Sequence, residues 1–234
     1  MGTGARRFAG TPQGGVISPL LSNIYLHVLD RVWEGRCAHL GTLVRYADDF
    51  VVMCDTKAHV EEARQRVSAV LTRLGLELHP EKTRTVDLSR GREGFDFLGC
   101  HLRKRMSGPV WERSRQRVYY LQRWPSARAM ARVRARVRAL TSRSRCHEDL
   151  RRVIADVNPV LRGWAQYFRT GNAATKFHHL DRYVEDRLHA LRRARAGSRG
   201  SLRYGANRRS FFEALGLLRL RGTIQYPGVA HATT

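Results

Sequence analysis

Residues 44–53 read VRYADDFVVM, in which two adjacent carboxylates, Asp48 and Asp49, stand between two apolar runs. Aliphatic and aromatic β-formers on each side of a short polar centre predict two antiparallel strands joined by a tight turn, with both aspartates at its tip. Adjacent carboxylates repel each other, and a cation that prefers hard oxygen ligands, such as Mg²⁺, would compensate their charge. An Asx-type turn on a solvated hairpin is the alternative, and the ten residues alone do not decide between the two.

A second segment lies upstream of this hairpin. Residues 10–26 read GTPQGGVISPLLSNIYL, a glycine-rich loop followed by an apolar stretch. The box at residues 46–49 resembles the metal-binding hairpin of reverse transcriptases, and residues 10–26 resemble the version found in group II intron-encoded reverse transcriptases/maturases. The resemblance extends from residue 10 to about residue 195. It implies an RNA-directed DNA polymerase that uses two Mg²⁺ ions for phosphoryl transfer, with Asp48 and Asp49 as catalytic metal ligands.

The glycine-rich loop is a candidate nucleotide site. Backbone N–H groups and the positive end of a following helix suit phosphate, although an ordinary loop and cap would have the same pattern. In the resembled family this loop lines the site of the incoming deoxynucleotide triphosphate, which implies that Gln13 contacts the nucleotide and that Gly14 allows its close approach. Lys82 matches the lysine of the family's L-x-x-x-x-x-K-T box and would lie near the nucleotide or primer backbone; a solvated loop lysine is the alternative.

Hydrophobic periodicity predicts the other elements of the first half. A helix is expected from about residue 19 to 34, with Asp30 and Arg31 facing out. Its inward face is expected to comprise Ile17, Leu20, Leu21, Ile24, Tyr25, Val28 and Leu29. A second helix over residues 58–74 should end at Gly75. Short strands are expected at 76–78 and 83–88, followed by a hairpin around residues 94–103, which in the family grips the primer end.

After Trp111 the pattern changes to three long amphipathic helices, opening near Pro125 and covering about 148–169 and 174–195, which predicts a small helical bundle. Residues 158–169 and 180–184 resemble the maturase X region, the thumb of these enzymes, which binds intron RNA and the template-primer. Aromatic and guanidinium planes suit unpaired bases and phosphates. The RNA-binding candidates are therefore Arg162, Tyr167, Arg169, Arg182 and Arg187, with a solvated arginine face as the alternative; Trp164 and Tyr183 are expected in the core.

The charge supports a polyanionic partner. The chain of 234 residues carries 43 basic and 20 acidic side chains, a net charge of +23. The excess is +4 over residues 1–110 and +19 over residues 111–234, so the second half is the expected nucleic-acid surface. Four scattered cysteines without a C-x-x-C pair, and no recognisable signal peptide or membrane span, favour a cytoplasmic protein without a membrane partner.

These features predict an α+β fold: a partial reverse transcriptase palm at residues 1–110, a helical thumb/maturase domain at 111–195, and a basic tail of unknown role at 196–234. The family's first palm motif supplies a further metal-ligating carboxylate upstream of the glycine-rich loop, and nine residues precede Gly10. We therefore expect an N-terminally truncated form with an incomplete Mg²⁺ site, inactive unless an upstream fingers-palm polypeptide joins it. A non-catalytic, maturase-like RNA-binding remnant is the alternative.

Overall fold

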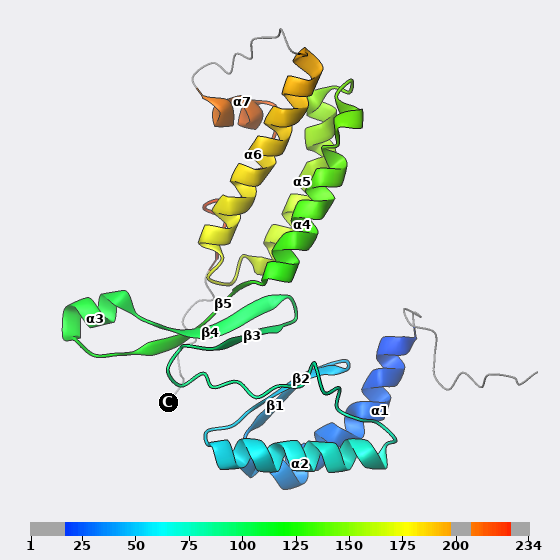
Figure 1. The fold of residues 1–234 in the computed structure, drawn as a ribbon, viewed down its shortest axis with the longest axis vertical. Coiled ribbons are helices and arrows are strands. Elements are labelled where there is room, and N and C mark those ends of the chain that lie inside the picture. The colour runs from blue at the N-terminus through cyan, green and yellow to red at the C-terminus, as the bar shows by residue number, and fades with distance from the viewer. Residues whose placement is uncertain (1–16, 198–206, 226–234) are drawn as a thin grey trace, which may run out of the picture. The chain divides into compact units, whose positions relative to one another are not determined.

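The computed structural model describes residues 17–197 and 207–225, and the chain divides into two compact units, residues 1–85 and 86–234. Each unit mixes helices with a small antiparallel sheet, so the predicted α+β class is confirmed (Figure 1). The predicted domain limits at residues 110 and 195 do not coincide with the limit of these units.

The first unit places a two-stranded sheet against two helices. Helix α1 (Ser18–Val32) continues through a π-helical turn (Trp33–Cys37) and a 3₁₀ turn (Ala38–Leu40). Strands β1 (Thr42–Tyr46) and β2 (Asp49–Met53) follow, and then helix α2 (Lys57–Arg73). The core of the unit is formed by Leu26, Leu29, Trp33, Cys37, Leu40, Ala63, Val67 and Leu71.

The predicted inward face of α1 is largely wrong. Of its seven members Leu29 is buried, whereas the other six are between 43% and 64% exposed. Helix α1 instead packs through Leu26, Leu29 and the following Trp33. The helix is apolar around most of its circumference, so periodicity alone could not tell which stripe meets α2. Tyr25 on the second apolar face still reaches the end of α2, because its hydroxyl donates to the Leu74 carbonyl.

Helix α2 starts and ends as its sequence predicts. The Thr56 hydroxyl accepts a hydrogen bond from the His59 N–H, and Gly75 adopts a left-handed φ of 68° just after the helix. The Gly75 and Leu76 N–H groups then donate to the Thr72 and Leu71 carbonyls, which satisfies the last turn.

The two short strands predicted after Gly75 are wrong, because residues 76–78 and 83–88 contain no strand. The N–H groups of Lys82 and Thr83 both donate to the carbonyl of His79, so a local turn around Pro80 takes up backbone donors that a sheet would have needed.

The second unit begins with a three-stranded antiparallel sheet. Its strands are β3 (Gly94–Phe97), β4 (Cys100–Met106) and β5 (Tyr119–Pro125), in spatial order β3-β4-β5, with helix α3 (Gly108–Ser114) between the last two. The expected change from strands to helices after Trp111 is therefore wrong for β5. Its Gln122 and Arg123 interrupt the apolar pattern, but seven residues pair with β4 and the ladder stabilises the strand.

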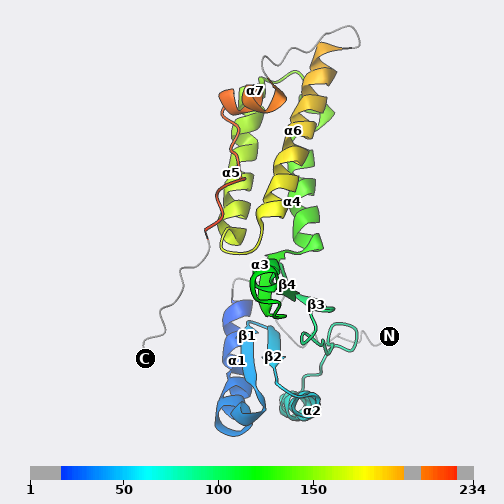
Figure 2. The same cartoon turned by 90° about the vertical axis from the view of Figure 1, so that its left-hand side faces the viewer.

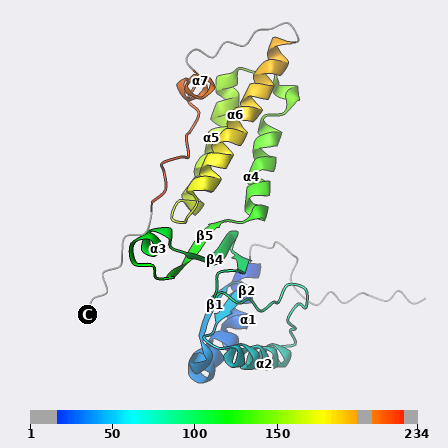
Figure 3. The same cartoon turned by 60° about the vertical axis from the view of Figure 1, so that its left-hand side comes forward.

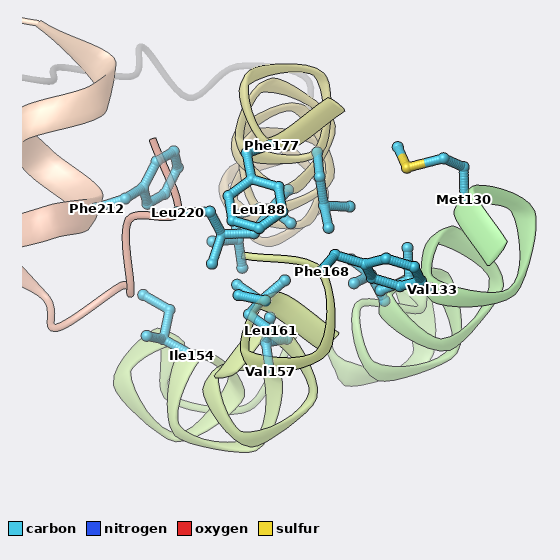
Figure 4. Packing of buried hydrophobic residues seen from close by; sticks show 14 of the residues in the cluster. Met130, Val133, Ile154, Val157, Leu161, Phe168, Phe177, Leu188, Phe212 and Leu220 are labelled. Carbon is cyan, nitrogen blue, oxygen red and sulfur yellow. The ribbon is translucent and has the colours of Figure 1, made fainter. Parts of the chain in front are cut away.

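Four helices follow: α4 (Ala127–Leu140), α5 (Leu150–Phe168), α6 (Ala174–Ala196) and α7 (Arg208–Ala214). Figures 1 and 2 show α4, α5 and α6 running along one another, which confirms the predicted bundle. Ser126 caps α4 through its hydroxyl, and α5 continues through Pro159. The core takes Met130 and Val133 from α4, Ile154, Val157, Leu161 and Phe168 from α5, and Phe177 and Leu188 from α6 (Figure 4).

Residues 208–225, which we call the C-terminal strap, return along the bundle (Figure 3). Phe212 and Leu220 are fully buried in the bundle core. The Asn158 side chain donates to the Gly216 carbonyl at 2.8 Å and accepts from the Leu218 N–H at 2.9 Å. The predicted basic tail thus contains a segment that completes the helical unit.

Candidate functional site

The two aspartates of the first unit lie at one end of the β1–β2 hairpin. Tyr46 pairs with Asp49, so Ala47 and Asp48 form a two-residue turn, in which Ala47 has a left-handed φ of 53°. Directly paired residues of two antiparallel strands point to the same face of the sheet, so Asp49 shares its face with Tyr46. Asp48 and Asp49 are both exposed. The predicted strand–turn–strand structure and its two carboxylates at the tip are thus present.

Arg45 attaches this hairpin tip to α1. It lies on the inner face of the sheet with Leu43, Phe50 and Val52, and its side chain is 11% exposed. Its Nε donates to Asp30 Oδ1 at 2.8 Å, and its Nη2 forms an ion pair with Asp30 Oδ2. Its Nη1 donates to the Asn23 side chain at 2.9 Å and to the Ala47 carbonyl at 2.8 Å. One guanidinium therefore holds both the helix and the turn that carries Asp48.

Asp30, expected to face solvent, is instead the partner of Arg45. The hydrogen bond from the Arg45 guanidinium lowers the pKa of Asp30 below its ordinary value, and the same pairing raises the pKa of Arg45. Neither residue was predicted to matter for the site. The available signal was Arg45 itself, a charged residue at an inward position of a strand, which requires a partner.

The hairpin tip has the donor chemistry of a magnesium site. Asp48 and Asp49 supply hard carboxylate oxygens at an exposed turn, where water can complete the coordination of a small divalent ion. Within residues 17–197 and 207–225, no group of three or more His, Cys, Asp or Glu side chains gathers to hold a metal. The two aspartates would hold Mg²⁺ from one side, and a two-ion site needs further ligands.

The other candidates of the first unit are placed as follows. Lys82 is exposed in the turn after α2. Gln13 and Gly14 lie outside the described residues.

The five RNA-binding candidates of the second unit differ in their surroundings. Arg162 and Arg182 are exposed, and Arg169 is half-buried. Arg187 donates to the Thr141 hydroxyl at 3.1 Å and to its carbonyl at 2.8 Å, so it joins α6 to the end of α4. Tyr167 is 58% exposed, and its hydroxyl donates to the Leu98 carbonyl at 2.8 Å.

Trp164 and Tyr183 pack against the bundle core, as predicted. The Trp164 ring centroid lies 4.9 Å from that of Phe168 and 5.3 Å from that of Phe177. All four cysteines are free. Among the helices of the described residues, none has the length and apolar character that crossing a bilayer requires.

Two family models match the chain, one after the other. The model for the reverse transcriptase (RNA-dependent DNA polymerase) matches residues 2–102, and the model for the group II intron maturase-specific domain matches residues 130–211. Together with the aspartate hairpin and the helical bundle, these matches define the class as a reverse transcriptase palm followed by a maturase domain. The resemblance to group II intron-encoded reverse transcriptases/maturases is therefore confirmed, with the reverse transcriptase match in the first part of the chain and the maturase match in the second.

Similar curated proteins agree with this placement. Protein YkfC of Escherichia coli (strain K12) is 35% identical over a segment that covers 42% of this chain and 33% of that protein. The group II intron-encoded protein LtrA of Lactococcus lactis subsp. cremoris is 65% identical over 26 residues, which are 11% of this chain and 4% of LtrA. The chain therefore spans a third or less of the curated relatives that it matches.

Proposed function

We propose that the first unit carries the metal-binding hairpin of an RNA-directed DNA polymerase and that the second unit is its RNA-binding maturase domain. The observation that carries this proposal is the hairpin tip, where Asp48 and Asp49 stand exposed on a turn tied to α1 through Arg45. Such a pair of oxygen donors suits Mg²⁺, which would neutralise charge on the reacting phosphates.

We infer that the remaining metal ligands come from outside the described residues, because the hairpin offers two carboxylates where two ions need more. In this proposal Gln13 and Gly14 place the incoming deoxynucleotide, and Lys82 binds the nucleotide or primer backbone. An upstream fingers-palm polypeptide would complete the polymerase site.

For the second unit, we propose that Arg162, Tyr167, Arg169 and Arg182 contact intron RNA or the template-primer. The exposed Tyr167 ring supports a stacking role, and the two exposed arginines support phosphate contacts. Arg187, the fifth candidate, has its Nε and Nη2 engaged with Thr141, so its contribution to RNA binding would come through the remaining Nη1 or through positioning of α6.

A metal-binding experiment tests the hairpin without requiring activity. Mn²⁺ is a paramagnetic substitute for Mg²⁺, and in the full chain it should broaden the amide signals of residues 46–50 selectively. Asp48→Asn and Asp49→Asn should each remove most of this broadening, and Asp55→Asn, the same change at an exposed position beyond β2, should leave it intact. Broadening that survives both substitutions at the tip would remove the metal from this hairpin.

Primer extension on an RNA template then distinguishes the polymerase from a non-catalytic RNA-binding protein. The hairpin tip supplies two carboxylates and a two-ion site needs further ligands, so this second candidate is tested beside the first. In a complex that supplies the remaining metal ligands, Asp48→Asn should abolish extension and leave RNA binding nearly unchanged. RNA binding without extension in every such complex would support the non-catalytic protein.

A further inference from the structure

The turn at the tip of the β1–β2 hairpin has a shape that its own residues do not favour. Ala47, the first residue of the turn, has a left-handed φ of 53°, a conformation that residues other than glycine rarely adopt. Two-residue hairpin turns that need a positive φ at this position usually carry Gly there. The turn that carries Asp48 therefore depends on contacts from outside itself to keep its shape.

Arg45 supplies such a contact, and two residues of α1 hold its guanidinium from different places. Asp30 accepts hydrogen bonds from Nε and Nη2, and the Asn23 side-chain oxygen accepts from Nη1 at 2.9 Å. The same Nη1 donates to the Ala47 carbonyl at 2.8 Å. Asn23 and Asp30 are seven residues apart, so they lie on one face of α1, about 10 Å apart along the helix.

Asn23 restrains a movement that Asp30 leaves open. A carboxylate that binds Nε and Nη2 holds one edge of the guanidinium, and the group can still pivot about that edge. Asn23 holds Nη1, the nitrogen that also binds Ala47, so a pivot would break both of these hydrogen bonds. The contact also fixes the orientation of the Asn23 amide, because a guanidinium has only donors and the amide oxygen must therefore face it.

We propose that Asn23 is a positioning residue for Asp48 as a metal ligand. It fixes the Arg45 guanidinium, which in turn fixes the Ala47 carbonyl and the turn that follows. Asn23 does this with an uncharged acceptor, so it adds no second negative charge beside Asp30. This inference rests on the proposed metal-binding hairpin and names a residue of α1 on which that site depends.

Two substitutions at this one position test the role in Mn²⁺ titrations of the full chain, read from the broadening of the amide signals of residues 46–50. Asn23→Ala removes the acceptor for Nη1 and should raise the apparent Kd for Mn²⁺ about 3–10-fold, since an exposed supporting hydrogen bond is lost. Asn23→Asp keeps an oxygen acceptor and adds a negative charge near the tip. It should bind Mn²⁺ as tightly as the wild type, or up to about 3-fold more tightly.

Matched controls on α2 separate this role from general effects of side-chain loss and charge. Gln65→Ala removes an exposed amide, and Ser68→Asp adds the same charge at an exposed position of the same unit. Each should change the apparent Kd for Mn²⁺ by less than about 2-fold. Hydrogen exchange of the amides of residues 50–53 checks that the hairpin strands persist in every variant.

A double-mutant cycle tests whether Asn23 acts through Arg45. Arg45→Lys keeps the positive charge and loses the planar fork that joins Asn23 to Ala47. In the Arg45→Lys background, Asn23→Ala should therefore change the apparent Kd by less than about 2-fold. An equal effect of Asn23→Ala in both backgrounds would overturn the positioning role.

The outcomes separate this inference from the proposed function. If the wild type shows no selective broadening at residues 46–50, the proposed metal-binding hairpin fails, and this inference fails with it. If the wild type binds Mn²⁺ and Asn23→Ala binds it equally well, the positioning role is overturned while the proposed function stands. A loss of affinity in Asn23→Asp as large as in Asn23→Ala would also overturn it, because the acceptor for Arg45 would then not matter.

Discussion

Arg45 is a single residue on which the position of the β1–β2 hairpin depends. It joins α1, the inner face of the sheet and the turn carbonyl of Ala47. The Arg45 guanidinium is 11% exposed, and its hydrogen-bond donors are satisfied. Replacing Arg45 would leave the acceptors of Asp30 unpaired, and replacing Asp30 would leave the buried guanidinium charge unpaired. Asp48 is thus positioned by residues that would not themselves touch a metal.

We expect Asp30→Asn to lower the local stability of the hairpin by about 2 kcal/mol, since a charge-assisted hydrogen-bond pair is lost. Hydrogen exchange of the amides of residues 43–53 measures this opening. Glu62→Gln, which breaks the exposed Glu62–Arg66 pair on α2, should change the free energy of opening of these amides by less than about 0.5 kcal/mol. Equal effects of the two substitutions would show that Arg45 does not hold the tip.

Asp30 also predicts a pH dependence. Pairing with Arg45 lowers its pKa in the folded state, so its stabilisation is complete above the unfolded pKa of about 3.9 and is lost as the pH falls through the folded pKa. Hairpin amide exchange should therefore accelerate more in the wild type than in Asp30→Asn when the pH falls from about 5 to about 3, after correction for intrinsic exchange. Parallel pH profiles would argue against the pair.

Asp181, on α6, has a pKa shift in the opposite direction. It is 6% exposed and accepts hydrogen bonds from the Leu220 and Arg221 N–H groups, and its burial raises its pKa. Because the folded pKa lies above the unfolded value, this group makes stability decline as the pH rises from about 4 through the folded pKa. The two aspartates should therefore give opposite slopes when each is compared with its asparagine variant.

At the scale of elements, the C-terminal strap is the feature that most changes the expected architecture. Its 208–225 backbone is held by Asn158 and Asp181, and the Gln225 N–H donates to the Arg169 carbonyl at 2.8 Å. The buried Phe212 and Leu220 fill the core between α5 and α6 (Figure 4). The bundle thus requires a segment that follows a glycine- and arginine-rich stretch in the sequence.

Phe212→Ala should destabilise the bundle by about 3–5 kcal/mol, because it removes a fully buried aromatic ring. Leu121→Ala on β5, where the side chain is 51% exposed, is the control and should cost less than about 1 kcal/mol. Urea unfolding followed by circular dichroism measures the free energy of unfolding of each variant, and the variants are compared where the dependence of this free energy on urea concentration is the same. A Phe212 effect as small as that of Leu121 would mean that the strap contributes little to the fold.

At the scale of the whole molecule, most of the excess positive charge lies in the second of the two structural units. Residues 86–234 carry 32 basic and 11 acidic side chains, whereas residues 1–85 carry 11 and 9. The second unit also contains the sheet β3-β4-β5 and the strap, so a fragment cut at the predicted limits of 111 and 195 separates β5 from β4 and exposes the bundle core.

We therefore expect a fragment of residues 86–234 to fold and to bind structured RNA with steep salt dependence, since its phosphate contacts release counterions. A fragment of residues 111–196 should be less stable and prone to aggregate. Size-exclusion chromatography and a salt titration of both fragments check this expectation. A monomeric, cooperatively unfolding 111–196 fragment would contradict the role given to the strap and to the β4–β5 pairing.

The sequence by itself determined the hairpin with its two aspartates, the helices α2 and α4–α6, and the basic character of the second half. These features depend on local patterns: alternation, three- and four-residue spacing, capping residues and composition. The candidate residues Asp48 and Asp49 were found in this way, and their local geometry followed from the same ten residues.

The tertiary structure alone decided which face of α1 is buried, that Arg45 pairs with Asp30, that β5 joins β4, and that Phe212 and Leu220 belong to the bundle core. Each of these depends on a partner distant in sequence: 15 residues separate Arg45 from Asp30, and 39 separate Leu220 from Asp181. Local propensity does not specify such a partner, because burial and hydrogen-bond satisfaction are properties of the packed chain.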